Sequence, residues 1–212
     1  FVDAGQVLGQ WPVDVAQIGC DMLKGAGRKF LRGPRGTALL YLRQDFLPQL
    51  TPAFLDVQSA PWSGEAGVMR SDARRFETSE TPVALWLGLG AALSLARELG
   101  VDRIRRRIAP LADHLRAGLG RVPGVTLQDL GGPERSGLVS FAVAGIAGSA
   151  VKERLAAEHH ISVAANGVPY TPHDMRARGL SEIVRASVSY LNTEEEVERL
   201  IKAVRAVAVS RS

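Results

Sequence analysis

The sequence contains one cysteine, Cys20, among its 212 residues. A single thiol cannot form an internal disulfide and cannot by itself hold a structural zinc ion, so the composition does not point to an oxidising compartment. We therefore expect a cytoplasmic protein. Long apolar runs are also missing, because the longest one, near Val83 to Leu95, contains two glycines and is too short and too mixed to span a bilayer. We expect no membrane partner.

Aromatic residues are scarce as well, at 6%, against 23% charged residues and a formal net charge of +4. The positive excess comes from scattered arginines and one run, formed by Arg103, Arg105, Arg106 and Arg107. No aromatic residues are interleaved with this run to stack on bases, so it is typical of a solvent-facing helix surface. We predict no nucleic-acid partner, and keep a basic DNA-binding protein as an alternative that salt-dependent retention would reveal.

The hydrophobic content of 46% is enough for one large domain or two small ones. The pattern predicts a strand end in FVDAGQ, a short helix in PVDVAQIG, and strands in CDMLKGAG and TALLYLR. The last of these is apolar on both faces, which predicts burial between layers. After an irregular stretch, residues 44–80, a helix should run from Thr81 and Pro82 to Leu99. The next helix should begin with Asp102 as N-cap and be kinked or divided at Pro110.

From about Gly124 the pattern changes to short strands and helices in the order ββαββα, which predicts a small α+β domain. Its strands are GVTLQDL, GLVSFAV, ISVAA and EIVRASVSY, and its first helix, SAVKERLAAEHH, should be capped by Ser149. In the closing helix, TEEEVERLIKAVRAV, Thr193 and Glu196 form a capping box. We place the domain boundary between residues 99 and 100, giving units 1–99 and 100–212.

Several common site patterns are missing. Lys29 follows Arg28 and precedes Phe30, so its glycine-rich loop is not the phosphate-binding loop of nucleotide hydrolases. GLGAAL, residues 88–93, lacks the third glycine of a dinucleotide fingerprint. The four histidines have no partner cysteines and no HExxH spacing, so we predict no metal site. His159 and His160 should instead end a helix, where imidazole suits the negative end of the helix dipole.

Asp3, Gln6 and Lys29 are the remaining candidates for chemistry. An aspartate and a lysine on neighbouring strand ends are the groups needed to hold a pyridine ring, with the carboxylate on the protonated ring nitrogen and the lysine on the aldehyde. On the residues alone, Asp3 could equally be an ordinary strand-end residue and Lys29 a solvated surface charge.

The segment VDAGQVLGQWPVDVAQIGCDMLKGAGRKFLRGPRGTALLYLR resembles the cofactor-lysine segment of the class V aminotransferase family of pyridoxal-phosphate enzymes. That family includes cysteine desulfurases, selenocysteine lyases and isopenicillin N epimerase-like proteins. The resemblance continues through RRFETSETPVALWLGLGAAL to GLSEIVRASVSYLNTEEEVERLIKAV. It implies an α/β protein of fold type I, with residues 1–99 as the C-terminal part of the large cofactor domain, residues 100–212 as the small α+β domain, and a homodimer.

The resemblance also implies roles for individual residues. Lys29 would form the Schiff base with pyridoxal 5'-phosphate and then move the substrate's α-proton. Asp3 would pair with the pyridinium nitrogen, and Gln6 would contact the phenolic oxygen of the ring. Arg185 matches the arginine that binds the substrate's α-carboxylate; without the resemblance it would read as an edge-strand arginine facing solvent.

Two phosphate contacts are implied with a departure from the family pattern. Arg28 stands where many relatives have a histidine at the phosphate site. Thr81, or Ser79, would reach the cofactor phosphate of a neighbouring subunit. The family's N-terminal half, which carries the phosphate cup and the group that stacks on the ring, does not occur in this sequence. We expect it in a longer gene product, which an intact-mass measurement would test.

The reaction implied is transamination of an amino acid through a Lys29 aldimine. The alternative is a β-lyase that cleaves a C–S or C–Se bond, and racemisation ranks third. Cysteine desulfurases carry a nucleophilic cysteine in the loop matching NGVPYTPHDMRARG, and none occurs there, so a lyase would work without a catalytic cysteine. A hypothesis of a different class is a catalytically silent fragment that acts as a binding module. The sequence does not identify the amino acid substrate.

Overall fold

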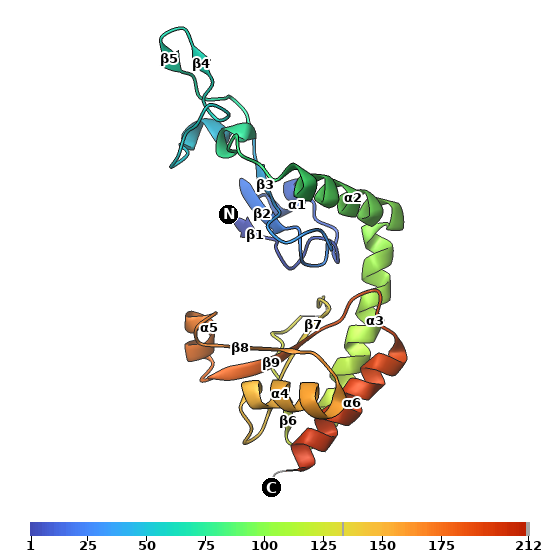
Figure 1. Ribbon diagram of the computed structural model, residues 1–212. Coiled ribbons are helices and arrows are strands. Elements are labelled where there is room, and N and C mark those ends of the chain that lie inside the picture. Colours follow the sequence, from blue (N-terminus) through green and yellow to red (C-terminus); the bar gives the residue numbers. More distant parts are fainter. Residues whose placement is uncertain (133, 211–212) are drawn as a thin grey trace. The chain divides into compact units, whose positions relative to one another are not determined.

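The computed structural model describes residues 1–132 and 134–210. The chain forms two compact units, one spanning Phe1–Asp102 and the other beginning at Arg103 (Figure 1). The boundary predicted from the sequence, between residues 99 and 100, lies three residues before this division.

The first unit is built on a three-stranded sheet with the order β1-β2-β3. Its strands are β1 (Val2–Asp3), β2 (Met22–Ala26) and β3 (Ala38–Leu42). β1 runs parallel to β2, with Asp3 opposite Lys24, and β3 runs antiparallel to β2. The connection from β1 to β2 contains the short helix α1 (Val15–Ile18), which Asp14 caps by accepting the amides of Ala16 and Gln17.

β3 is not buried between layers, contrary to the expectation from its apolar sequence. Leu40 is 41% exposed, and the small core of this unit lies beside β1 and β2, around Ala4, Cys20 and Leu23. The alternation of side chains explains the difference, because Leu39 and Tyr41 pack against this core and Leu40 lies on the other face of the sheet. Cys20 is buried in this core, just before β2.

The stretch 44–80 is largely irregular, as predicted. It holds two 3-10 turns, η1 (Leu47–Gln49) and η2 (Ala73–Phe76), and a two-stranded hairpin of β4 (Trp62–Ser63) and β5 (Ala66–Gly67). The buried Arg75 ties the stretch together, since its guanidinium donates to the carbonyls of Leu47 and Leu50 at 3.1 Å and to that of Arg70 at 2.7 Å. α2 (Val83–Leu99) follows Pro82, close to its predicted start.

The second unit begins in α3, which spans Val101–Gly120. One expectation for this helix was wrong, since it starts one residue before Asp102, which is therefore in the first turn and not the N-cap. Of the two outcomes expected at Pro110, a kink or a division, the division does not occur, and the helix continues through the proline. The stripe of Ile104, Ile108, Leu111 and other apolar residues is buried and keeps the helix on its core despite the proline.

Four antiparallel strands form the sheet of this unit, in the order β6-β7-β9-β8. They are β6 (Val125–Leu127), β7 (Leu138–Val143), β8 (Ala164–Gly167) and β9 (Glu182–Ser187). Two helices predicted from the sequence are present, α4 (Gly148–His159) and α6 (Glu194–Val209), and α5 (Pro172–Ala177) was not predicted. α4 ends at His159, with His160 in a left-handed conformation as its C-cap, which confirms the predicted end.

The two faces of this sheet differ. Val139 and Phe141 of β7 and Val184 of β9 are fully buried in a core shared with α3, α4 and α6 (Figure 1). Because side chains alternate along a strand, Ser140 and Arg185, which stand opposite each other, lie on the other face. The alternation thus directs polar groups away from the core, onto one face of the sheet.

The predicted cap of α6 is confirmed, whereas the predicted cap of α4 was wrong. Thr193 and Glu196 form the predicted capping box at the start of α6. Ser149 does not cap α4, whose N-cap residue is Ala147; the Ser149 amide and hydroxyl both donate instead to Glu182 of β9, each at 2.9 Å. A carboxylate from a distant strand therefore satisfies the helix start in place of a local hydroxyl.

Within the described residues no single helix is long and apolar enough to cross a membrane. α2 and α3 reach that length and composition only when they are taken together as a bent pair.

Candidate functional site

The first candidate site lies at the end of β1, around the carboxylate of Asp3. Its Oδ1 accepts the backbone amide of Gly5 at 2.9 Å, and its Oδ2 lies 3.0 Å from Nζ of Lys24 on the neighbouring strand. The Gly5 hydrogen bond, followed by the Lys24 ammonium, holds the pKa of the Asp3 carboxyl below its ordinary value of 3.8. Asp3 is therefore an ionised acceptor held at a strand end.

Gly5 lies between Asp3 and Lys29 and has no side chain to separate them. A Cβ atom at Gly5 would lie 3.0 Å from Asp3 Oδ1 and 3.5 Å from Lys29 Nζ, so these two atoms are no further apart than the sum of the two distances. Lys29 also acts on Asp3 as a nearby positive charge. The structure thus brings together the carboxylate and the amine that the sequence had paired, with a side-chain-free residue between them.

The turn that carries Lys29 is built by glycines. Gly27 O accepts the amide of Gly33 at 2.8 Å, and Lys29 O accepts that of Arg32, which has a left-handed φ of 63°. The turn lies against Gly9, where a Cβ would come within 2.5 Å of the Leu31 nitrogen. Gly9 also has a φ of 90°, so a side chain there is excluded twice. These contacts fix the segment on which Lys29 is mounted.

The other predicted site residues of the first unit are Gln6, Arg28 and Thr81, with Ser79 as the alternative to Thr81. Gln6 is half-buried in the turn after β1, where its carbonyl accepts Nε2 of Gln10 at 2.6 Å. Arg28 is exposed beside Lys29, and Thr81 is half-buried ahead of Pro82. Ser79, the alternative to Thr81, donates both its amide and its hydroxyl to Asp56, at 2.7 and 3.0 Å.

The second candidate site is a pocket of about 540 Å³ on the polar face of the sheet in the second unit. Arg185 lines it from β9, an interior strand between β7 and β8, so the edge-strand reading of this arginine was wrong. The Nε atom of Arg185 and the Oδ1 atom of Asn166 are buried and have no hydrogen-bond partner within residues 1–132 and 134–210. A buried donor and a buried acceptor left open on one pocket wall are suited to a polar ligand.

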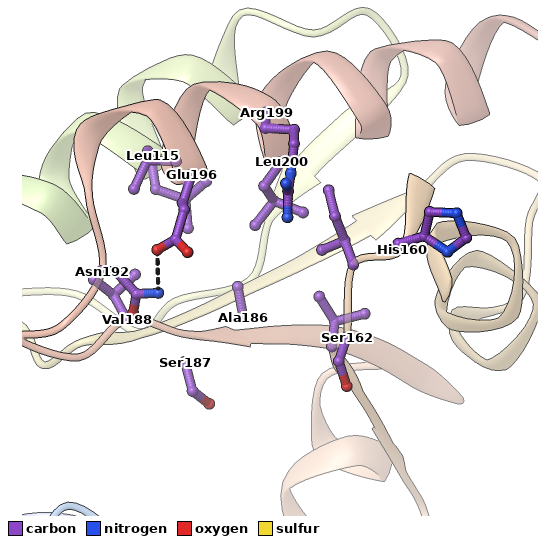
Figure 2. A pocket seen from close by; sticks show the side chains of 13 residues that line it. Leu115, His160, Ser162, Ala186, Ser187, Val188, Asn192, Glu196, Arg199 and Leu200 are labelled. Carbon is purple, nitrogen blue, oxygen red and sulfur yellow. Dashed lines mark hydrogen bonds between the residues drawn. The ribbon is translucent and has the colours of Figure 1, made fainter. Parts of the chain in front are cut away.

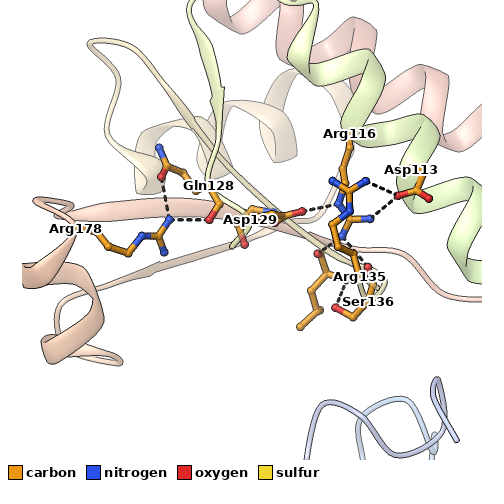
Figure 3. A network of polar contacts seen from close by, with 9 residues as sticks. Asp113, Arg116, Gln128, Asp129, Arg135, Ser136 and Arg178 are labelled. Carbon is orange, nitrogen blue, oxygen red and sulfur yellow. Dashed lines mark hydrogen bonds and ion pairs between the residues drawn. The ribbon is translucent and has the colours of Figure 1, made fainter. Parts of the chain in front are cut away.

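Around this pocket most of the other charged groups hold one another (Figure 3). Arg116, which is 4% exposed, donates to Asp129 at 2.5 Å and to Asp113 at 3.2 Å. Asp129 in turn accepts the backbone amide of Ser140 on β7 at 2.7 Å. Arg178 donates to the Gln128 carbonyl at 2.7 Å. This network fixes the pocket wall, whereas the buried Nε of Arg185 has no hydrogen-bond partner among the described residues.

A smaller hollow of about 200 Å³ lies at the start of α6 (Figure 2). Two of its polar groups are engaged with each other, since Asn192 Nδ2 donates to Glu196 Oε2 at 2.9 Å and Glu196 closes the capping box. On its α6 side the hollow therefore presents helix-capping groups. Among the described residues no three His, Cys, Asp or Glu side chains gather in a way that could hold a metal ion.

The sequence reading missed two residues of these sites. Lys24 interrupts the apolar strand MLKGA, and that polar position was the available signal that it faces outward beside Asp3. Asn166 lies in a segment read as a loop, and only the pairing of Asn166 with Ile183 places it on the face that carries Arg185.

The fold and the Asp3–Lys29 arrangement define an α/β protein in which a carboxylate at the end of β1 lies near an amine in the turn after β2. A family model described as Aminotransferase class-V matches residues 1–200, and the chain belongs to this family. A probable cysteine desulfurase of Xylella fastidiosa (strain Temecula1 / ATCC 700964) is 29% identical over 208 residues, which cover 96% of this chain and 48% of that protein.

Solved structures agree with this assignment. The apo cysteine desulfurase of Thermococcus onnurineus NA1 superposes with a TM-score of 0.87 at 28% identity, over 98% of this chain and 52% of that one. The cystine C–S lyase C-DES, in complex with cysteine persulfide, gives 0.80 at 25% identity, over 94% and 50%. A variant of C-DES holds glycine covalently linked to its pyridoxal-phosphate cofactor. The chain has the fold type I architecture of these proteins and spans about half of their length.

Proposed function

We propose that this protein is a pyridoxal 5'-phosphate-dependent enzyme that acts on an amino acid, with Lys29 as the residue that carries the cofactor. The observation that carries the proposal is the closeness of the Asp3 carboxylate and the Lys29 amine, which both lie within 3.5 Å of the position that a Cβ of Gly5 would take. The cofactor fits this set of groups, because it needs a nucleophilic amine for its aldehyde and an anionic acceptor for its ring nitrogen.

Pyridoxal phosphate supplies a ring that takes up the electron pair released at the substrate's α-carbon. Lys29 Nζ would hold the cofactor through its aldehyde, and it would also be the base that moves the proton at the substrate's α-carbon. Asp3 would accept the ring N–H in a charge-assisted hydrogen bond, which keeps the ring nitrogen protonated.

The remaining cofactor contacts are proposals that follow from the family membership. Gln6 would meet the phenolic oxygen, and Arg28 and Thr81 would neutralise the phosphate, Thr81 across a subunit boundary. The exposure of Arg28 beside the lysine turn supports its part, since an anionic ligand can reach it without rearrangement of the core.

Arg185 would bind the substrate's carboxylate. Its buried, unpartnered Nε supports this role, because a guanidinium gains most from a ligand that supplies two oxygens in one plane. The arginines on the same pocket wall have carboxylate or carbonyl partners already, as described for Arg116 and Arg178.

For the reaction itself we place cleavage of a C–S bond at the β-carbon first, and transamination second. The names of the relatives favour the first, since C-DES is a C–S lyase and several curated relatives are cysteine desulfurases. The segment 168–181 has no cysteine, and Cys20 is 8% exposed in the first unit. The sulfur group would therefore leave to solvent, as sulfide from cysteine or as a persulfide from a disulfide substrate such as cystine, and not to a cysteine of this segment.

The first test is covalent labelling. The protein incubated with pyridoxal 5'-phosphate should be yellow, and borohydride reduction should fix the cofactor on the peptide that contains Lys29. The Lys29→Ala variant should lose both the reducible adduct and turnover. The matched control is Lys152→Ala, which removes an exposed lysine on α4 of the other unit and should change neither. A protein that stays colourless at saturating cofactor would favour the silent binding module instead.

The second test separates the reactions. With cysteine or cystine, β-elimination gives pyruvate and ammonia, whereas transamination gives the oxo acid and the aminated cofactor. Replacing Arg185 with Met should raise KM for the amino acid at least tenfold and leave the covalent labelling of Lys29 intact. An unchanged KM would contradict the carboxylate role of Arg185.

We also propose a cytoplasmic homodimer. Phe54, Val57 and Trp62 of the first unit are 87%, 73% and 71% exposed, and apolar side chains so exposed are typical of a protein interface. Light scattering of the purified protein would test the dimer, and a monomeric mass at micromolar concentration would contradict it.

A further inference from the structure

Lys24 lies beside Asp3, one of the residues proposed to hold the cofactor, and the proposed chemistry gives it no role. It lies in the middle of β2, directly opposite Asp3 of the parallel strand β1. Its Nζ is 3.0 Å from Asp3 Oδ2, and the two side chains are 45% and 61% exposed. Two amines therefore lie near the Asp3 carboxylate: Lys24 forms an ion pair with it, and Lys29 acts on it as a nearby positive charge.

The two oxygens of Asp3 have separate partners. Oδ1 accepts the Gly5 amide and is directed toward Gly5 and Lys29, whereas Oδ2 forms the ion pair with Lys24. A carboxylate has about four lone-pair sites, so it can accept a further N–H while Lys24 remains bound. Lys24 need not leave for a ligand to use Asp3.

We infer that Lys24 is a positioning residue of the cofactor site: its ammonium shares the Asp3 carboxylate with the ring nitrogen of the cofactor and makes that nitrogen easier to deprotonate. The inference rests on the proposed function, because it takes Asp3 as the partner of the ring nitrogen.

The direction follows from charge. Asp3 alone stabilises a protonated ring nitrogen, since an anion favours a nearby cation. A second cation bound to the same carboxylate lies a few ångström from that nitrogen, and a like charge disfavours the protonated form. Lys24 thus weakens the electron sink that Asp3 strengthens, and it also fixes the carboxylate so that Oδ1 keeps facing Lys29.

The size of the effect is set by solvent. A charge within a few ångström shifts a pKa by about 1–3 units, and we expect the lower end, about one unit, because both side chains are half exposed and water screens the pair. Lys24→Met should raise the pKa of the ring nitrogen by that amount. Lys24→Arg keeps the charge and should stay near the wild-type value.

The experiment measures the ring nitrogen directly. The protein is loaded with pyridoxal 5'-phosphate labelled with ¹⁵N in the ring, and the ¹⁵N chemical shift is followed against pH in wild type, Lys24→Met and Lys24→Arg. The matched control is Arg43→Met, which breaks another exposed ion pair of the same sheet, Arg43 with Asp21 at 2.7 Å, at the end of β2 away from Lys29. It should leave the ring nitrogen unchanged.

A second readout needs no cofactor. The ¹³C signal of the Asp3 carboxyl in the unloaded protein should titrate at a higher pH in Lys24→Met than in wild type, because one of the groups that lower its pKa is gone while the Gly5 hydrogen bond remains. Circular dichroism of each variant establishes that the exposed substitution leaves the fold intact.

The outcomes are distinct. A normal adduct at Lys29 with the same ring-nitrogen pKa in Lys24→Met and wild type overturns the inference and leaves the proposed function standing. An equal shift in Arg43→Met also overturns it, since any lost cation would then do. Failure to form an adduct at Lys29 in wild type overturns the proposed function and the inference together.

Discussion

Replacing Arg116 with Met should destabilise the second unit by about 3 kcal/mol. Arg116 is a residue of α3, and its side chain, which is 4% exposed, is directed toward the strands that carry the pocket. Its guanidinium donates to Asp129 and Asp113 and to the backbone carbonyls of Ser136 and Leu138, the last two at 2.8 and 2.9 Å (Figure 3). Methionine fills much of the same volume but donates no hydrogen bond.

The magnitude follows from what the substitution leaves behind. Removing one partner of a buried ion pair costs about 3–5 kcal/mol, because the other charge stays buried and uncompensated. Asp129 is 13% exposed and keeps the backbone amide of Ser140, so it is not wholly abandoned. Asp113 is 55% exposed and returns to water at little cost. These two facts place the expected loss at the lower end of the range.

Native-state hydrogen exchange in urea measures the loss where it occurs, through the slowest amides of β7 and β9. The tryptophans, Trp11, Trp62 and Trp86, all lie in the first unit, so their fluorescence provides an internal reference that should not move. The control is Arg105→Met, which breaks an ion pair with Glu134 whose side chains are 34% and 66% exposed, and which should cost about 1 kcal/mol or less. Equal losses in the two variants would refute the argument that burial decides the value of Arg116.

Three further outcomes are expected. Gly5→Ala places a methyl group 3.0 Å from the Asp3 carboxylate. The fold should stay stable, while the affinity for pyridoxal phosphate, measured by absorbance titration, should fall at least tenfold. An unchanged affinity would contradict the placement of the cofactor between Asp3 and Lys29. Thr193→Ala should lower the free energy of unfolding, measured in urea, by about 1 kcal/mol, whereas Thr193→Ser keeps the capping hydroxyl and should retain the wild-type value. The Ser149 amide and hydroxyl lower the pKa of Glu182 from its ordinary 4.5, so stability is fully present above that pH and declines as the pH falls below it; Glu182→Gln should flatten this acid limb.

Local rules were enough for much of the secondary structure. The capping box of Thr193 and Glu196 and the apolar stripe behind it predicted α6, because both signals are contained within one or two turns of helix. The end of α4 at His159 and the start of α2 near Pro82 were predicted for the same reason. Their stabilising partners are neighbours in the chain.

The errors came from partners that are distant in the chain. Ser149 was expected to cap α4, but Glu182 of β9 takes its amide and hydroxyl. Pro110 was expected to kink or divide α3, but the helix is not divided, because its buried stripe against the core outweighs the local penalty. In each case a tertiary contact overrode a correct local preference.

The sequence by itself determined the family and made Lys29 the candidate for the cofactor lysine, since the spacing from Asp3 to Lys29 and the glycines of the turn are fixed by the order of residues in the chain. Tertiary structure decided what surrounds these groups. The parallel pairing of β1 with β2 put Lys24 on Asp3, and the order β6-β7-β9-β8 made Arg185 an interior residue with an open Nε. Strand pairing joins residues far apart in the chain, and no local pattern of side chains specifies which strand becomes the neighbour.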